Sequence, residues 1–247
     1  MSVTVRSLSV VVPAFNEQDN LEASTDVVVR ALIAAAVDYE VIIVDDGSSD
    51  GTGAIADQLA AADPRIRVIH HAQNMGLGCA YQHGVDMASK EYFIWVPADN
   101  VCPEETLVRL FQTIGEADVV IPHITNARGR AFSRWIVSRT YNHVMNFLFG
   151  YRIHSINAIT IFPAAFLRAN PVSTYGYAFQ AEALFRALDQ KLSYVEVPVA
   201  FHNPVGRSKA VTLKNIASVI ATVVRLYGEL RIRPVLGASQ TRNTRVP

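Results

Sequence analysis

Two adjacent carboxylates, Asp45 and Asp46, follow the apolar residues 41–44 and precede a Gly-Ser turn. A continuous apolar run of this length is typical of a strand that is buried on both faces of a parallel sheet. In open parallel sheets, ligands bind beyond the carboxyl ends of the strands. Paired acids at such an end could contact a ribose hydroxyl, the edge of a base, or a metal ion bound to a phosphate. Taken alone, the segment is also compatible with an ordinary polar turn after a core strand.

Three further predicted strands, residues 8–12, 67–70 and 92–96, also end in loops with chemically useful residues. These loops contain Asn16 and Glu17, then Asn74 and Gly76, then Asp99. Helices are predicted between the strands, at about residues 20–37, from residue 51, and up to residue 88. Strands that alternate with helices predict right-handed crossovers and a mostly parallel sheet. All four strand ends then fall on one edge of the sheet, which favours a ligand site over unrelated polar turns.

The composition predicts one globular domain. The chain has 247 residues, of which 50% are hydrophobic and 18% are charged, and this length gives an ample core. We assign residues 1–236 to a single domain and expect residues 237–247 to form a disordered tail. Cys79 and Cys102 form neither a disulfide framework nor a metal motif, and the N-terminus has no signal-peptide layout. No apolar run reaches the roughly 20 residues of a membrane-spanning helix, so we expect a cytoplasmic protein.

The formal net charge is zero, but the two halves of the chain carry opposite charges. Residues 1–118 contain 18 acidic and 6 basic residues, a net charge of −12, whereas residues 119–247 contain 4 acidic and 16 basic residues, a net charge of +12. This division predicts two sites with different electrostatic tasks. An acidic half can hold a phosphorylated ligand only through a cation, and a basic half can bind an anionic ligand or a membrane surface directly. Mutual neutralisation of the two halves is the alternative.

Four sequence blocks resemble the nucleotide-sugar domain of glycosyltransferase family 2, in the order that the family has them. They are VVPAFNE, VIIVDDGSSDGT, NMGLGCAYQHG and the acid after FIWV. The later segments GYAFQAEALFRA, VEVPVAF and GRSK resemble the dolichyl-phosphate mannosyltransferase-like branch, which transfers a sugar from a nucleotide to a polyprenyl phosphate. The resemblance covers about residues 8–230. It implies a GT-A fold, an α/β architecture with a Rossmann-like, mostly parallel sheet, a nucleotide-sugar half up to about residue 118 and an acceptor half after it.

The resemblance implies roles for residues on the strand-end loops. The predicted donor-binding residues are Pro13, Phe15, Glu17, Asp45, Asp46 and Gly76, with Arg207 and Lys209 of the GRSK segment. Asp46 would face the uracil or guanine base, and Asp45 would support its loop. Gly76 would let the backbone approach the donor, and the GRSK segment would close over the diphosphate.

Asp99 matches the second acid of the family's Asp-x-Asp motif, which holds Mg²⁺ or Mn²⁺ on the donor diphosphate. Such an ion neutralises the departing nucleoside diphosphate. Pro97 replaces the first acid of the motif, and Val101 stands where the polyprenyl branch often has a further polar ligand. We therefore expect a weaker metal affinity than is usual in the family. A solvated loop acid is the alternative for Asp99.

Residues 134–149 have apolar side chains at helical spacing, which predicts an amphipathic helix. One side carries Val137, Tyr141, Val144, Met145 and Leu148, and the other carries Arg134, Ser138, Arg139, Asn142 and Asn146. The family has a helix here that lies against the bilayer, with an Arg and a Ser near the acceptor phosphate. The predicted acceptor-binding residues are therefore Arg134, Ser138 and Arg139. A half-buried core helix with a solvated basic side is the alternative.

Gln180 and Glu182 lie on the segment that faces the donor sugar and the acceptor in the family. With Asp99, they are the predicted catalytic residues. Glu182 is the first acid after residue 118, and a buried carboxylate needs partners, so we expect an Arg to pair with it. An acid that the helix dipole favours at a helix N-terminus is the alternative.

The predicted function is an inverting hexosyl transfer from a GDP- or UDP-linked sugar to a polyprenyl phosphate, with peripheral contact to the cytosolic face of a membrane. We expect no nucleic-acid partner. A family 2 enzyme with a soluble or glycan acceptor is one alternative, favoured by His154 and His202 near positions where the family has an acid and an Arg. A nucleotide-sugar binding protein with weak or no turnover is another, suggested by Pro97 and Val101.

Overall fold

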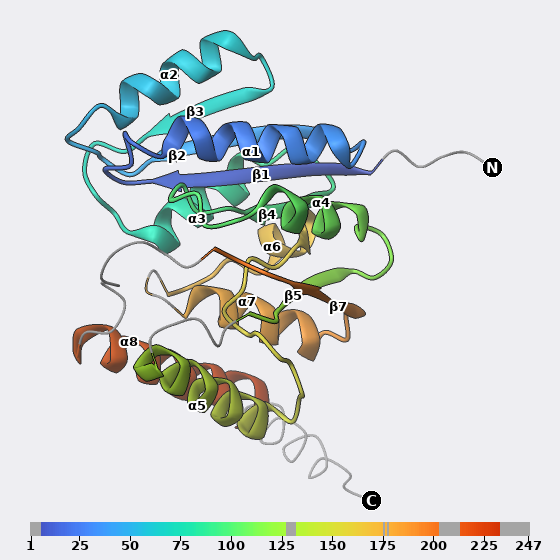
Figure 1. Ribbon diagram of the computed structural model, residues 1–247. Helices are drawn as coiled ribbons and strands as arrows, with labels where there is room; N and C mark the ends of the chain where they lie inside the picture. The colour runs from blue at the N-terminus through green and yellow to red at the C-terminus, as the bar shows by residue number, and fades with distance from the viewer. Residues whose placement is uncertain (1–5, 127–131, 175, 177, 203–212, 233–247) are drawn as a thin grey trace, which may run out of the picture.

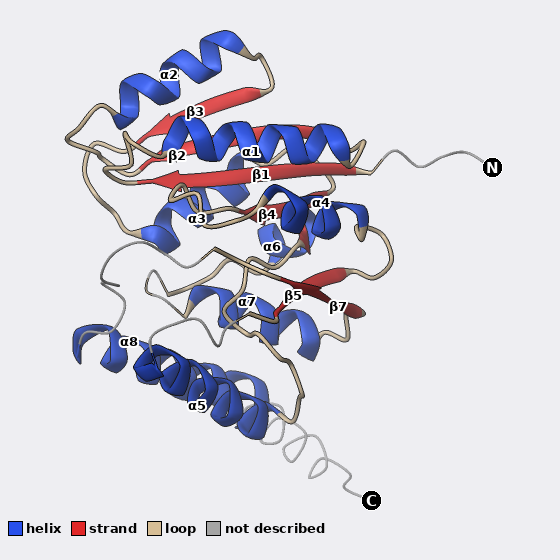
Figure 2. Cartoon of the chain, viewed as in Figure 1, coloured by secondary structure: helices blue, strands red, loops and turns tan. Residues whose placement is uncertain are grey.

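The computed structural model of the protein describes residues 6–126, 132–174, 176, 178–202 and 213–232, with the backbone alone for residues 132–135 and 213–216. Strands and helices alternate through the first half of the chain and build the upper part of the molecule in Figure 1. Helices predominate in the lower part, which the second half of the chain forms (Figure 2).

A five-stranded sheet with the order β3-β2-β1-β4-β6 is the main element of the fold. The strands are β1 (Ser7–Ala14), β2 (Asp38–Asp45), β3 (Ile66–His70), β4 (Tyr92–Trp95) and β6 (Phe162–Pro163). β1 to β4 run parallel, and β6 pairs with β4 in the antiparallel direction. The residues of the apolar run 41–44 are fully buried, as the sequence predicted for a strand covered on both faces. The predicted mostly parallel sheet is confirmed.

Helices cover both faces of this sheet. α1 (Leu21–Ala34) and α4 (Glu104–Gln112) pack together over one face, and α3 (Leu77–Met87) and α6 (Ala164–Ala169) lie over the other (Figure 1). α2 (Thr52–Ala62) packs against β3 at the edge of the sheet. α3 approaches β1 closely because residue 84 is glycine: a Cβ at Gly84 would lie 2.5 Å from Cγ2 of Val11.

A second, two-stranded parallel sheet belongs to the later half of the chain. It consists of β5 (Val119–Ile124) and β7 (Tyr194–Val199), and an isolated bridge between Val120 and Ile161 connects it to the chain just before β6. α7 (Phe179–Asp189) lies beside this sheet. α5 (Phe132–Phe149) and α8 (Leu213–Tyr227), which continues into a π-helical turn at Gly228–Ile232, lie at the end of the molecule far from β3 (Figure 2).

One continuous cluster of buried apolar side chains joins the two halves of the chain. Tyr81 of α3 contacts both Phe93 of β4 and Phe179 of α7, with ring centroids 5.2 and 4.7 Å apart. Phe149 of α5 stacks on Phe185 of α7 at 4.4 Å. Because close-packed side chains resist displacement, this core fixes α5 and α7 relative to the main sheet.

Candidate functional site

Four loops meet at the carboxyl edge of the main sheet. They follow Ala14 of β1, Asp45 of β2, His70 of β3 and Trp95 of β4, and the strand arrows point to the same side in Figure 1. The parallel registers place Ala14 beside Asp45, and Asp45 beside His70. The predicted convergence of the strand ends is therefore confirmed. We call these loops the strand-end loops: residues 15–18, 46–51, 71–76 and 96–101.

The carboxylate of Asp46 holds the loop after β3. Its Oδ1 accepts hydrogen bonds from the backbone N–H of Met75 at 2.8 Å and from Nδ1 of His71 at 2.7 Å, and its Oδ2 accepts one from the N–H of Gly76 at 2.8 Å. Gly76 has a φ of 91°, which glycine adopts without strain. Asp46 is buried, and an ionised carboxylate is stable there only with such donors. Asp46 therefore supports a loop, and its contact with a base stays a prediction.

Asp45 fastens the loop after β2 and the end of β3. Its Oδ1 accepts a hydrogen bond from the N–H of Ser48 at 3.0 Å, and its Oδ2 lies 3.1 Å from Nδ1 of His70. Burial alone would raise the pKa of Asp45, but the hydrogen bonds from Ser48 and His70 lower it below its ordinary value. Contacts with Asp45 and then with Asp57, whose Oδ1 lies 3.0 Å from Nε2 of His70, raise the pKa of His70. These are the contacts expected of a loop support.

A chain of polar contacts extends from Asp46 into α3. Nε2 of His71 lies 2.8 Å from Nδ1 of His83, and Nε2 of His83 lies 3.9 Å from Sγ of Cys79. Burial, and then the negative charge of Asp46, raises the pKa of the Cys79 thiol, so this thiol is protonated and can donate. In the tautomer that carries its proton on Nδ1, each histidine donates toward Asp46 and accepts at Nε2, and the thiol also lies 4.0 Å from Sδ of Met75. Neither histidine was expected at the site, although His71 directly follows a predicted strand.

The loop after β1 is attached to the loop after β2. The N–H of Asn16 donates to Oγ of Ser48 at 3.0 Å, and the N–H of Glu17 donates to Oγ1 of Thr52 at 2.8 Å. Asn16 has a φ of 55°, a conformation that asparagine tolerates better than most residues. These contacts hold the two loops as one surface.

The three predicted donor-binding residues near the end of β1 differ in exposure. Pro13 is buried within the strand, whereas Phe15 is 41% exposed on the loop. Glu17 is half-buried, and its Oε2 accepts a hydrogen bond from Nδ2 of Asn20 at 2.9 Å. Phe15 and Glu17 are therefore accessible whereas Pro13 is not, and the donor-binding roles of all three stay predictions.

The Asp99 side chain is exposed on the loop after β4, although the surrounding protein removes part of the water around its carboxyl. Desolvation raises the pKa of its carboxyl, a hydrogen bond from the backbone of Val101 opposes that change, and the negative charge of Glu17 adds to it. Neither acid forms an ion pair with a basic side chain in the part of the chain that the structure describes. Two uncompensated carboxylates that repel each other at the end of a sheet would favour a cation between them.

The loop that carries Asp99 is held through its backbone. Oγ of Ser24 in α1 donates to the carbonyl of Pro97 at 3.2 Å, and the N–H of His202 donates to the carbonyl of Val101 at 2.9 Å. Pro97 therefore makes a structural contact at the position where the family has its first acid. Among the described residues, no three His, Cys, Asp or Glu side chains are grouped so that they could hold a metal alone. A metal at Asp99 would need ligands from the substrate and water.

Two buried polar atoms lie at the end of β4 and the start of α7 without a hydrogen-bond partner among the described residues. They are Nε1 of Trp95 and Oε1 of Gln180. Phe179 connects the two residues, because it precedes Gln180 and its ring lies 5.8 Å from that of Trp95. Buried polar groups are normally hydrogen-bonded, so two unsatisfied atoms here fit a region that receives a polar ligand. The catalytic role of Gln180 stays a prediction.

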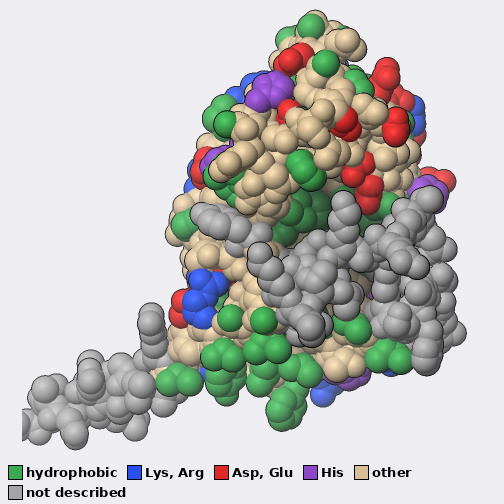
Figure 3. Space-filling view, turned by 90° about the vertical axis from the view of Figure 1, so that its left-hand side faces the viewer, with side chains coloured by type: hydrophobic (Ala, Val, Ile, Leu, Met, Phe, Trp, Pro, Cys, Tyr) green, Lys and Arg blue, Asp and Glu red, His purple; other side chains and the backbone are tan. Residues whose placement is uncertain are grey.

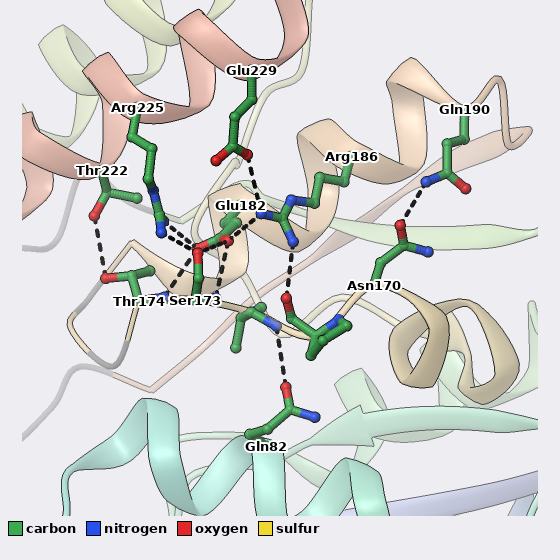
Figure 4. A network of polar contacts seen from close by, with 12 residues as sticks. Gln82, Asn170, Ser173, Thr174, Glu182, Arg186, Gln190, Thr222, Arg225 and Glu229 are labelled. Carbon is green, nitrogen blue, oxygen red and sulfur yellow. Dashed lines mark hydrogen bonds and ion pairs between the residues drawn. The ribbon is translucent and has the colours of Figure 1, made fainter.

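Glu182 is 0% exposed in the first turn of α7, and its carboxylate has two arginine partners (Figure 4). Oε1 pairs with Arg186 at 2.8 Å and accepts hydrogen bonds from the N–H and Oγ–H of Ser173 at 3.0 and 2.7 Å. Oε2 pairs with Arg225 of α8 at 3.0 Å and accepts one from the N–H of Thr174 at 3.2 Å. The predicted arginine pairing is confirmed. Because these donors occupy both oxygens, the geometry favours a structural anchor over the predicted catalytic role.

The helix predicted at residues 134–149 is confirmed as α5, but its inward side differs from the prediction. The sequence predicts Asn142 and Asn146 on the side opposite the apolar residues, and both face the protein. Nδ2 of Asn142 donates to the carbonyl of His154 at 2.7 Å, and Asn146 forms two hydrogen bonds with the backbone of Ile153, at 2.8 and 2.9 Å. These amide contacts attach the helix to residues 153–154. They turn part of the predicted apolar side outward, so that Val144 is exposed.

The predicted phosphate-binding residues are described only in part. Ser138 and Arg139 are exposed on α5. The side chain of Arg134 and the whole of Arg207 and Lys209 lie outside the described residues, so their roles stay predictions. The roles of Ser138 and Arg139 toward an acceptor likewise stay predictions.

His154, which stands near a position where the family has an acid, has an acidic partner. Its Nδ1 lies 2.9 Å from Oε2 of Glu196 on β7, and its ring stacks on that of His123 with centroids 4.1 Å apart. A carboxylate is therefore present in this region, although it comes from another strand. The altered sequence at residue 154 thus does not remove the negative charge from this part of the acceptor half.

α5 and α8 share an exposed apolar surface, which we call the α5–α8 face. Its side chains are Ile136, Val137, Val144 and Phe147 of α5 and Ile220, Val224 and Tyr227 of α8. Phe147 is 87% exposed and Val224 is 67% exposed. The ring of Tyr227 lies 6.0 Å from that of Phe149, so the two helices meet at this point. In Figure 3, apolar side chains gather along the lower edge of the molecule, with basic side chains and a histidine beside them.

A shallow hollow of about 380 Å³ lies on the α5 side of this face, lined by Arg139, His143 and their neighbours Ile136, Thr140 and Val144. Large exposed apolar patches mark interaction sites on monomeric proteins. None of the described helices combines the length and hydropathy that crossing a bilayer requires.

The fold and the strand-end loops define a glycosyltransferase of the GT-A architecture. The chain belongs to glycosyltransferase family 2, because the sequence model of that family, Glycosyl transferase family 2, matches residues 9–176. The chain is 35% identical over 212 residues to a polyprenol monophosphomannose synthase of Mycolicibacterium smegmatis, a match that covers 80% of this chain and 78% of that protein. It is 30% identical over 211 residues to an undecaprenyl-phosphate mannosyltransferase of Micrococcus luteus, with 81% and 85% covered.

Solved structures match the fold at lower identity. Glucosyl-3-phosphoglycerate synthase from Mycobacterium tuberculosis, in complex with Mn²⁺, uridine diphosphate and phosphoglyceric acid, superposes with a TM-score of 0.68 and 20% identity over 90% of this chain and 79% of that chain. TarS of S. aureus, residues 1–349, gives a TM-score of 0.62 and 18% identity, with 91% and 66% covered. These structural similarities support the fold alone and confirm the predicted GT-A fold. The family match and the sequence relatives confirm the predicted family.

Proposed function

We propose that the protein transfers a hexose, with mannose as the first candidate, from a nucleotide sugar to a polyprenyl phosphate at a membrane surface. The observation that carries this proposal is the α5–α8 face. An enzyme whose acceptor phosphate is attached to a lipid must work at the interface between water and lipid. The two relatives, a polyprenol monophosphomannose synthase and an undecaprenyl-phosphate mannosyltransferase, point to the same acceptor and sugar.

The α5–α8 face has the chemistry of an interfacial surface. Phe147 and Val224 can insert among lipid chains, and transferring such side chains out of water is favourable by about 1.5–3 kcal/mol each. Arg139 and His143 border the hollow beside them and can meet phosphate groups at the level of the lipid headgroups. The association is therefore peripheral.

The strand-end loops would receive the nucleotide. Phe15 has an exposed ring that a base could stack on. Asp46 is buried beneath the loop that contains Gly76. Gly76 is also the residue before α3, so the N–H groups in the first turn of this 11-residue helix would be available to a diphosphate in the site. A helix N-terminus favours phosphate through its free N–H groups and its dipole. This arrangement suits the donor class that the family uses.

A divalent cation fits beside Asp99. The carboxylates of Asp99 and Glu17 repel each other and have no basic partner among the described residues, and a cation would relieve that repulsion. Mg²⁺ and Mn²⁺ prefer oxygen ligands, and Mg²⁺ keeps several waters, so one or two carboxylates with diphosphate oxygens suffice. When bound, the ion would neutralise the departing diphosphate.

The proposed chemistry is an inverting displacement at the anomeric carbon. An oxygen of the acceptor phosphate attacks this carbon while the bond to the nucleoside diphosphate breaks. A phosphate monoester is already ionised near neutral pH, so the step needs no strong general base. The carboxylate of Glu182 is consistent with this, because Ser173, Thr174 and two arginines occupy its oxygens.

The test is a transfer assay with the full chain, Mn²⁺, and either GDP-mannose or UDP-glucose as the donor. One reaction contains undecaprenyl phosphate in phosphatidylcholine vesicles, and the other contains a water-soluble phosphate monoester at the same concentration. We expect labelled mannose in the lipid fraction alone. Transfer to the soluble acceptor alone would overturn the lipid proposal. Nucleotide binding without transfer to either acceptor would favour a binding protein with weak turnover.

A further inference from the structure

We infer that Arg225 of α8 is a positioning residue that couples the α5–α8 face to Ser173, Thr174 and the start of α7, beside the proposed donor site. The inference rests on the proposed function, because it concerns how the transferase site responds to a lipid surface. Arg225 follows Val224 directly, and the two side chains have opposite surroundings. Val224 is 67% exposed on the apolar face, whereas Arg225 points inward to Glu182 (Figure 4).

Arg225 joins three elements through two contacts. Its Nη2 lies 3.0 Å from Oε2 of Glu182 on α7, and its Nη1 donates to Oγ of Ser173 in the preceding loop. Ser173 also donates its N–H and hydroxyl to Oε1 of Glu182. The guanidinium therefore ties the start of α7 and residue 173 to the same point on α8. A planar fork of donors suits this double contact, which a lysine could not reproduce.

Two further residues of α8 lie against the residues that follow Ser173. Oγ1 of Thr222 lies 3.2 Å from Oγ1 of Thr174. Gly176 lies so close to α8 that a Cβ there would be 2.9 Å from Oγ of Ser218. Ser218, Thr222 and Arg225 are spaced by four and three residues, so they share one side of the helix. One side of α8 therefore lies against Ser173, Thr174 and Gly176, and the other side forms the apolar face.

The held segment leads to the site. It continues into Phe179, whose ring contacts Trp95 at the end of β4, and into Gln180, whose Oε1 is buried without a partner among the described residues. The N–H of Val172 donates to Oε1 of Gln82 in α3, the helix that begins after Gly76. The position of α8 therefore bears on both the β4 end and α3. If lipid at the α5–α8 face displaces α8, Arg225 would carry that displacement to Gln180 and Trp95.

A network of the same kind at the opposite end of the sheet provides a matched control. Glu40 at the start of β2 is buried, and its carboxylate accepts hydrogen bonds from Ser9 and Ser89 and pairs with Arg67 at 2.6 Å. The side chains of Arg67 and Arg225 are similarly exposed, at 41% and 36%. Substituting Arg67 removes a comparable ion pair far from α8. Effects shared by the two arginine variants therefore reflect stability alone.

The experiment uses Trp95 as a reporter in the full chain. Trp135 is the only other tryptophan in the sequence, so Trp135→Phe leaves a single fluorescent indole. Arg225→Met, Arg225→Lys and Arg67→Met are added to this background. Each protein is titrated with vesicles of phosphatidylcholine and phosphatidylglycerol in a 3:1 ratio. Binding is measured by cosedimentation and the site by Trp95 emission, and kcat and KM for GDP-mannose are measured with undecaprenyl phosphate.

We expect vesicles to shift the Trp95 emission in the parent and in Arg67→Met. Arg225→Met should still bind vesicles, lose the emission shift, and lose at least about tenfold in kcat with little change in KM. The emission shift and kcat of Arg225→Lys should lie between those of the parent and Arg225→Met. This variant keeps the test valid if Arg225→Met folds poorly. A parent that does not bind vesicles would overturn the docking face and the coupling together. Binding with an unchanged emission shift and kcat in both Arg225 variants would overturn the coupling alone.

Discussion

The carboxylate of Asp46 and the imidazole of His71 lie 2.7 Å apart, and both side chains are buried. Their neighbours Asp45 and His70 repeat the arrangement at 3.1 Å. Two consecutive acids at the end of β2 therefore meet two consecutive histidines at the end of β3, because the parallel register places Asp45 beside His70. The loops that would receive the nucleotide depend on these two pairs for their shape.

Removing the imidazole of His71 should destabilise the protein and weaken nucleotide binding. His71→Leu leaves Oδ1 of Asp46 without one of its two donors, and losing a hydrogen bond to a buried charge costs about 1–3 kcal/mol. Urea denaturation measures this loss, and calorimetry with UDP and GDP measures the affinity. His71→Asn keeps a donor near the position of Nδ1 and should recover much of both. Equal losses in the two variants would mean that ring packing, not the hydrogen bond, matters.

The Asp45–His70 pair should stabilise the fold over a limited pH range. Hydrogen bonding to Asp45, and then to Asp57, raises the pKa of His70 above 6.5, so its contribution is complete below that value and is lost as the pH rises through the folded-state pKa. The pKa of Asp45 is lowered from 3.8 despite the opposing effect of burial, so its contribution is lost only as the pH falls through that lower value.

The measurement is urea denaturation of the native chain and His70→Gln at several pH values. Between the two pKa values the native chain should be more stable by about 0.5–1 kcal/mol, since His70 is half exposed and solvent screens the pair. The difference should shrink in alkaline solution. A difference that grows as the pH rises would contradict the assigned pairing.

Local sequence patterns predicted the strand ends because parallel strands bring their ends together whatever the details of packing. The run at residues 41–44 and the loops at Glu17, Gly76 and Asp99 needed no knowledge of distant contacts. The histidine pairs were missed for a related reason. His70 ends a predicted strand and His71 follows it, much as Asp45 and Asp46 follow the neighbouring strand, and the parallel register of the two strands could have matched them.

Contacts between distant parts of the chain explain what the sequence did not predict. The β5–β7 sheet pairs residues 119–124 with residues 194–199, which local patterns cannot match. The inward side of α5 is set by the amides of Asn142 and Asn146, whose partners are backbone atoms of residues 153–154. Glu182 needed an arginine, but nothing local identifies Arg225, which lies 43 residues later in the sequence.

Removing the charge of Glu17 should change the pH dependence of metal binding at Asp99. The negative charge of Glu17 is one cause of the raised pKa of Asp99, so Glu17→Gln should lower that pKa. If Mn²⁺ binds only to ionised Asp99, nucleotide binding that depends on Mn²⁺ is lost below a certain pH, which we call the acidic limit. In Glu17→Gln this limit should move to lower pH. Thermal unfolding with GDP or UDP, with and without Mn²⁺, measures this limit.

Nucleotide at 100-fold over its Kd should stabilise the folded protein by about 2.7 kcal/mol. Asp99→Asn should remove the part of this stabilisation that depends on Mn²⁺. The exposed Glu116, on the turn before β5, provides a control. Glu116→Gln should leave the acidic limit unchanged. A Glu17→Gln protein with an unchanged limit would separate Glu17 from the metal site, and full Mn²⁺ dependence in Asp99→Asn would move that site elsewhere.

Replacing Phe147 with serine should weaken binding to vesicles without unfolding the protein. Because this ring is 87% exposed, its loss should change the free energy of unfolding by no more than about 0.5 kcal/mol. A ring that inserts into lipid gains about 1.5–3 kcal/mol, so its loss should lower the vesicle affinity about 10- to 100-fold. Ile33→Ser on α1 removes a side chain that is 60% exposed away from the α5–α8 face and should bind like the native chain. Cosedimentation measures the vesicle affinity of both variants. Equal losses of affinity would rule out a specific lipid-binding face. If the native chain is a dimer that dissociates in Phe147→Ser, the face instead binds a second copy of the chain.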